Sequence, residues 1–136
     1  MASLDTTVLV DLLRRPSSSG RLAAVRLIER LQEAKEPLLT TRFCIAELLV
    51  GIEYLPNGLD ARRKMDEALS DIGVLEFGDF AAERYAKIAA HLQKQGNRIG
   101  EMDLLIAATA QIYDQTVYTC NTSHFRRVPG LRVEEY

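Results

Sequence analysis

The chain has 136 residues, and 47% of them are hydrophobic, which is enough to build the core of one domain over residues 1–136. Its formal net charge of −2 gives no overall attraction to nucleic acid or to a membrane surface, so such binding would need a local patch. No uncharged segment approaches the roughly 18 residues of a membrane span, and the N-terminus lacks the basic start of a signal peptide. We therefore expect a cytoplasmic protein with no membrane partner.

Short strands and helices alternate in the predicted secondary structure. The first half of the chain predicts a strand at 3–4, a helix at 6–13, a loop at 17–20 and a helix after it, a strand at 38–41, and a helix at 43–55 that ends at PNG. The second half predicts helices at 60–71, 79–95 and 102–113, strands at 74–77, 116–119 and 131–134, and a polar turn at 121–123. This alternation indicates an α/β fold with a parallel sheet and helices on both faces.

Two predicted helices carry a carboxylate among apolar residues. Asp103 lies in the first turn of EMDLLIAATA, a segment that is apolar or small on nearly every side, which predicts burial. Glu47 shares a helical face with Phe43, Val50 and Tyr54, which also predicts burial. An unpaired buried carboxylate costs several kcal/mol, roughly, so both residues call for a cation or a hydrogen-bonding partner.

Two further polar residues follow predicted strands. Asp5 ends the first strand and Asn121 follows the fourth, and ligands of open α/β sheets bind outside the carboxyl ends of the strands. Clustered carboxylates repel one another, and a hard divalent cation removes that repulsion. The sequence therefore predicts that Asp5, Glu47 and Asp103 hold magnesium.

Simpler structural roles remain open for these residues. Asp5 can cap the helix that follows it, and both Asp103 and Glu101 can stabilise the positive end of theirs. Glu47, in the middle of a helix, has neither role. We expect His124, beside the predicted turn, to be a polar loop residue without a catalytic part.

Local positive charge and thiols complete the set of candidates. Arg14, Arg15 and Arg126 can contact phosphates, although any one of them is more often a solvated surface charge. We expect Cys120 to serve packing rather than act as a nucleophile, because nothing nearby in sequence supplies an activating base. With Cys44 it would form a pair of reduced, unlinked thiols.

Four segments in order resemble the signatures of PIN-domain ribonucleases, in particular of VapC-type toxins. They are LDTTVLVDLL, TTRFCIAELLVGI, MDLLIAATA and TCNTSHFRRVPGL, and together they extend over nearly the whole chain. The resemblance implies an α/β/α sandwich around a short-stranded parallel sheet and a metal-dependent endoribonuclease that uses Mg²⁺ or Mn²⁺. It also implies an RNA substrate, a cognate antitoxin in the active-site groove, and a homodimer.

The resemblance assigns roles by motif position. Asp5, Glu47 and Asp103 match the three acidic ligands, and Thr6 matches the hydroxyl residue beside the first of them. The expected chemistry is attack of water on a phosphodiester bond, without a protein nucleophile. Unpaired RNA would be bound with help from local arginines, and the predicted substrate contacts are Thr6, Thr7, Arg14, Arg15 and Arg126.

Two positions depart from the commonest pattern of that family. Thr7 stands where Asn or Ser is frequent, and Asn121 stands where a fourth acid is often found. Asn121 keeps a predicted catalytic role through its carbonyl oxygen, but it adds no charge, which weakens the case for a second permanently bound ion. The alternative function is therefore a PIN-like module that binds RNA or protein without cleaving. A phosphatase of the haloacid-dehalogenase kind usually has a second Asp two residues after the first, where this chain has Thr7.

Overall fold

Five short parallel strands form the central sheet of the computed structural model, which describes residues 1–136. They are β1 (Ala2–Leu4), β2 (Leu38–Thr41), β3 (Gly73–Leu75), β4 (Thr116–Tyr118) and β5 (Arg132–Glu134). Their order across the sheet is β3-β2-β1-β4-β5, and every neighbouring pair is parallel. All residues of the central strand β1 are buried, whereas the edge strands β3 and β5 are partly exposed. The predicted parallel sheet is confirmed.

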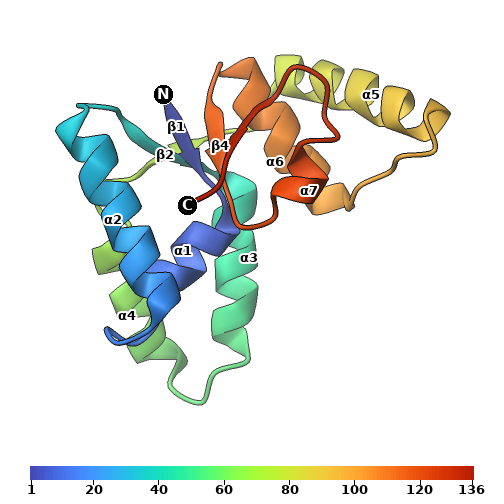
Figure 1. Ribbon diagram of the computed structural model, residues 1–136. Coiled ribbons are helices and arrows are strands. Elements are labelled where there is room, and N and C mark those ends of the chain that lie inside the picture. Colours follow the sequence, from blue (N-terminus) through green and yellow to red (C-terminus); the bar gives the residue numbers. More distant parts are fainter.

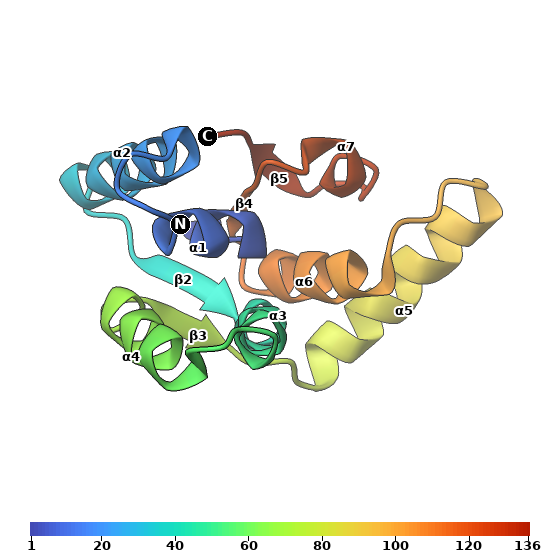
Figure 2. The ribbon, with the colours of Figure 1, turned by 90° about the horizontal axis from the view of Figure 1, so that it is seen from below.

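Seven helices connect these strands and flank the sheet (Figures 1 and 2). They are α1 (Thr6–Leu12), α2 (Ser19–Glu33), α3 (Arg42–Glu53), α4 (Gly58–Ala68), α5 (Asp79–Lys94), α6 (Glu101–Ile112) and α7 (Thr122–Phe125). In both views α5 packs along α6 at the outside of the molecule. None of the helices combines the length and hydrophobicity that crossing a membrane requires.

The predicted elements are present, with one error in type. The polar turn expected at 121–123 is wrong, because α7 forms a helical turn there, closed by the Arg126 amide donating to the Thr122 carbonyl at 2.9 Å. Its residues have weak helix propensity, but Phe125 is fully buried, and its packing in the core holds the helical turn in place. Tertiary packing therefore decides the conformation of this segment.

The two helices that carry predicted site residues are buried to different degrees. Helix α6 is buried along Leu104 and the run from 106 to 110, as its apolar sequence predicts. On the face of α3 that carries Glu47, Phe43 and Glu47 are half-buried, whereas Val50 is 58% exposed and Tyr54, just after the helix, is 85% exposed. The expected burial of this face therefore holds only at its N-terminal end. A helical wheel shows which residues share a face, but not whether another element covers it.

The topology brings three elements to one edge of the sheet. Strand β1 lies between β2 and β4, and the ladder continues past β1 because the Asp5 amide donates to the Tyr118 carbonyl at 3.0 Å. Helix α3 follows directly from β2, with the Thr41 hydroxyl accepting from the Cys44 amide as its cap. Helix α6 leads through a tight turn into β4 and so runs back along it, which places its N-terminus at the same carboxyl edge.

Phe125→Ala should destabilise the fold by about 3–5 kcal/mol, because it empties a fully buried aromatic site beneath α7. Urea unfolding followed by circular dichroism measures the change. Phe80→Ala is the matched control, since Phe80 is 74% exposed on α5 and its removal should cost little. Equal losses from both variants would contradict this account of α7.

Candidate active site

A pocket of about 530 Å³ opens at the carboxyl edge of the sheet. Its lining contains the predicted catalytic residues Asp5, Glu47, Asp103 and Asn121, together with the predicted contacts Thr6, Thr7 and Arg14. The predicted contacts Arg15 and Arg126 are not among the residues that line it. The fold thus gathers side chains from α1, α3, α6 and the β4–α7 loop around one space.

Asp5 is the deepest acid of the pocket, with 3% of its surface exposed. The Thr119 hydroxyl donates to its Oδ2 at 2.7 Å, and the Thr7 hydroxyl donates to the same atom at 3.3 Å. Asp5 stands at the N-cap position of α1, but its side chain makes no capping hydrogen bond. Burial raises the pKa of Asp5, and the Thr119 hydrogen bond offsets part of that rise, while the negative charge of Asp103 adds to it.

Glu47 faces the pocket from the second turn of α3 and is half-buried. The Thr6 hydroxyl donates to its Oε1 at 2.7 Å and fixes the orientation of the carboxylate. Burial is the main cause that raises the pKa of Glu47, and repulsion from Asp5 and Asp103 raises it further. Electrostatic repulsion therefore links the three acids, although they come from different elements.

Asp103 is held by two side chains from the loop and helix that follow β4. The Asn121 Nδ2 donates to its Oδ2 at 3.1 Å, and His124 Nδ1 lies 2.9 Å from the same oxygen. With the Nδ1–H tautomer His124 donates to the carboxylate, and with the opposite tautomer its Nδ1 accepts from Asn121 Nδ2 at 2.8 Å. His124 therefore lies beside the site, and the expectation that it has no catalytic part stays a prediction. The signal is the spacing of Asn121 and His124 on one helical turn, which becomes visible only when α7 is known to be helical.

These residues fit a hard divalent cation in their chemistry. The side-chain hydrogen bonds fall on one oxygen of each carboxylate, which leaves Asp5 Oδ1, Glu47 Oε2 and Asp103 Oδ1 without a side-chain donor. Neither Asp5 nor Glu47 forms an ion pair, and Asp103 faces only His124. Oxygen donors with unbalanced negative charge are what Mg²⁺ and Mn²⁺ prefer. No three acidic, His or Cys side chains lie close enough together to coordinate one ion as they stand. Binding of an ion would therefore have to bring the carboxylates closer to one another.

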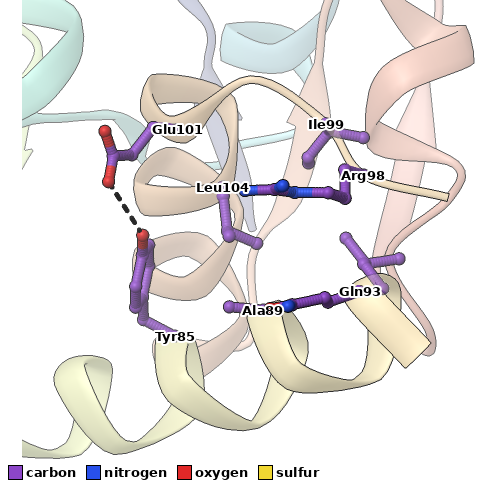
Figure 3. Close-up of a pocket in the computed structure, with 8 residues that line it drawn as sticks. Tyr85, Ala89, Gln93, Arg98, Ile99, Glu101 and Leu104 are labelled. Atoms are coloured by element: carbon purple, nitrogen blue, oxygen red, sulfur yellow. Dashed lines mark hydrogen bonds between the residues drawn. The ribbon is translucent and has the colours of Figure 1, made fainter. Parts of the chain in front are cut away.

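Glu101, two residues before Asp103, faces a different pocket. Its carboxylate accepts a hydrogen bond from the Tyr85 hydroxyl at 3.4 Å, in a cavity of about 210 Å³ between α5 and α6 that Arg98 also lines (Figure 3). Of the two acids in the first turn of α6, only Asp103 therefore belongs to the candidate active site.

The two cysteines lie in contrasting places. Cys44 is fully buried at the start of α3, and burial raises the pKa of its thiol. Cys120 is exposed and lines the active-site pocket, so the expectation that it serves packing is wrong. The two thiols are free, as the sequence predicts.

Comparison with known proteins assigns this arrangement to a family. The PIN domain family matches residues 2–131. The chain therefore belongs to the PIN domain family, and its relatives within that family are VapC ribonucleases. Ribonuclease VapC of Rickettsia bellii is 33% identical over 137 residues, covering 96% of this chain and 92% of the relative. The tRNA(fMet)-specific endonuclease VapC of Shigella flexneri is 28% identical and covers 98% and 96%.

Two solved structures have the same fold as this chain. VapBC2 from Rickettsia felis, bound to a DNA fragment from its promoter, matches with a TM-score of 0.89 at 25% identity, over 99% of this chain and 98% of that chain. FitAcB from Neisseria gonorrhoeae matches with a TM-score of 0.81 at 27% identity, over 98% and 96%. The sandwich expected from the sequence signatures is confirmed.

Without metal, the acidic cluster should make the protein less stable as the pH rises. Because the folded-state pKa values of Asp5 and Glu47 are raised, the folded protein binds more protons than the unfolded chain between about pH 4 and those raised values, and stability falls through that window. Glu47→Gln removes one charge and should flatten the fall. Urea midpoints from pH 4 to 8 in chelator measure it.

The matched control for that series is Glu53→Gln, an exposed glutamate on the same helix. Its profile should run parallel to that of the parent protein. A Glu47→Gln profile that also runs parallel to the parent would contradict the repulsion inferred at the pocket.

Proposed function

We propose that the chain is a metal-dependent endoribonuclease toxin, built on a PIN domain over residues 1–136 and neutralised by a cognate antitoxin. The observation that supports this most is that Asp5, Glu47 and Asp103 line one pocket, each with a carboxylate oxygen that has no side-chain donor. The VapC ribonucleases among its relatives and the toxin–antitoxin complexes among its structural neighbours support the same function. RNA is the proposed substrate, and Mg²⁺ or Mn²⁺ is the proposed cofactor.

Asp5, Glu47 and Asp103 would hold the ion, which when bound supplies Lewis-acid activation of water and of the scissile phosphodiester. The protein side chains around them set the geometry. Thr119 fixes the carboxylate of Asp5, and Thr6 fixes that of Glu47. Because each of these bonds occupies a single oxygen, the other oxygen would be left for the ion. Preorganised ligands of this kind avoid the cost of ordering them during the reaction.

Asn121 and His124 would act on Asp103 from the other side of the pocket. Both contact the same oxygen, so the second oxygen of Asp103 keeps one orientation toward the ion. Asn121 reduces the negative charge of the site compared with an acid at that position. This favours a single resident ion, with any second one arriving together with an RNA phosphate.

The remaining partners follow from the same proposal. The antitoxin would cover the groove that contains the pocket and so exclude RNA. A homodimer stays a prediction from the family resemblance, and light scattering of the purified protein tests it. A cytoplasmic location stays a prediction from the sequence.

Asp103→Asn should lower RNA cleavage by more than about 100-fold, since losing a direct ligand should cost at least as much as losing its supporting partners. The assay uses a mixed pool of structured RNAs with Mg²⁺, Mn²⁺ or chelator, followed on sequencing gels. Asp66→Asn, on the exposed face of α4, is the matched control and should cleave like the parent.

The same assay separates the alternative function from the proposed one. Asn121 in place of an acid favours the non-cleaving module, which would bind RNA or protein with no metal-dependent cutting by the parent protein. Full cleavage by Asp103→Asn would instead overturn the assignment of the site.

Mg²⁺ or Mn²⁺ at millimolar concentration should raise the melting temperature by several degrees, because an ion that binds only the folded state stabilises it by mass action. Differential scanning fluorimetry with and without chelator measures the shift. Asp103→Asn should reduce this shift, whereas Asp66→Asn should preserve it. An unchanged melting temperature across all metal concentrations would contradict the proposed metal site.

A further inference from the structure

Arg14 is the one basic side chain among the residues that line the active-site pocket. The same lining contains four acids, so a polyanion that approaches the pocket meets mostly negative charge. The side chain of Arg14 is 57% exposed, and its terminal amino groups have no hydrogen-bonding partner in the structure. Arg14 therefore places a positive charge at the pocket, and its terminal amino groups are available as hydrogen-bond donors.

A buried carboxylate holds the inner end of this guanidinium. Asp11 Oδ1 lies 3.0 Å from Arg14 Nε, and the Asp11 side chain is 11% exposed, against 57% for Arg14. The ion pair is made on the Nε side of the guanidinium, and neither terminal amino group forms a hydrogen bond, so both are available to another anion. An ion pair formed only to neutralise Asp11 would be expected to engage those terminal groups as well.

Asp11 is itself fixed on two sides. The Tyr136 hydroxyl donates to Asp11 Oδ2 at 2.7 Å, across 125 positions of sequence. Burial raises the pKa of Tyr136, and the hydrogen bond to Asp11 adds to that rise, so the phenol stays a donor. On the other side, a Cβ atom at Gly20 would lie 2.6 Å from Asp11 Oδ1, so helix α2 leaves room for the carboxylate only because position 20 is glycine.

The backbone of Arg14 is held as well. Arg21 Nη1 donates to the Leu12 carbonyl at 2.9 Å and to the Arg14 carbonyl at 3.1 Å. These bonds satisfy carbonyls at the end of α1 and tie the following segment to α2. The main chain of Arg14 is thus tied to α2, and its side chain is paired with a buried carboxylate, before any substrate arrives.

We propose that Asp11 and Tyr136 are positioning residues that hold Arg14 at the mouth of the acidic pocket, where its guanidinium binds a backbone phosphate of the substrate RNA. This rests on the proposed function, because it takes RNA as the ligand. The metal would offset charge at the bond that is cut, and Arg14 would bind a neighbouring phosphate. A guanidinium that is already held in place binds a phosphate more tightly than a mobile guanidinium does, because it loses less side-chain entropy on binding.

The test measures binding of a fluorescein-labelled 20-nucleotide single-stranded RNA of mixed sequence, by anisotropy at several salt concentrations, in a full-length Glu47→Gln background that prevents cleavage. Arg14→Gln should weaken binding about 5- to 10-fold and reduce the slope of log affinity against log salt by about 0.7, the loss of one phosphate contact. Tyr136→Phe and Asp11→Asn should weaken it about 2- to 5-fold. Neither should add to the effect of Arg14→Gln in a double variant.

Cleavage kinetics of the protein that retains Glu47 give a second readout. A merely structural role of Tyr136 would not produce the same change in it. Tyr136→Phe should raise KM for the cleaved RNA and leave kcat unchanged, because it loosens substrate binding only. Tyr113→Phe is the matched control, since its hydroxyl donates to the Glu76 carbonyl away from the pocket. Arg62→Gln, which removes an arginine paired with Asp66 on α4, is the control for loss of one positive charge.

An Arg14→Gln variant that binds RNA with unchanged affinity and salt slope would overturn the inference, as would full additivity of Tyr136→Phe with Arg14→Gln. A parent protein that binds RNA through Arg14 but cuts nothing would reject the nuclease and keep the positioning role. A parent protein that cuts RNA without dependence on Arg14 would keep the nuclease and reject the positioning role. Absence of both binding and cutting would reject both proposals.

Discussion

The burial of the Asp5 carboxylate at the end of the central strand is the constraint on which the site depends. A group that is 3% exposed loses most of its hydration, and hydroxyl donors from Thr119 and Thr7 restore only part of it. The strand order places this charge beside the start of α3 and the start of α6, each of which adds an acid. The fold therefore accepts an electrostatic cost at this edge, which binding of a cation would relieve.

Hydrogen bonds between distant parts of the chain control the orientation of these acids. Thr6 reaches Glu47 across 41 positions, and Thr119 reaches Asp5 across 114. Asn121 and His124 reach Asp103 from the segment after β4. Each carboxylate is thus oriented by a side chain from another element, so the arrangement exists only when the sheet and its helices are assembled.

The sequence predicts the strands, most helices and the position of the acids, because periodicity and strand–helix alternation report burial directly. It fails where packing decides the outcome. Helix α7 has weak propensity and is fixed by Phe125, and the face of α3 with Glu47 is open at its C-terminal end because no element covers Val50 and Tyr54. The link from Tyr136 to Asp11 joins residues from opposite ends of the chain, and no local pattern predicts such a contact.

The contrast between the two thiols makes the pocket accessible to selective chemistry. Cys44 is fully enclosed and its pKa is raised, which suppresses its thiolate, whereas Cys120 is exposed on the pocket wall next to Asn121. A thiol-directed fluorophore or spin label would therefore attach to the native sequence at one defined position, without engineered cysteines. The alkylation rate of that thiol would then report how much of the pocket a bound macromolecule shields.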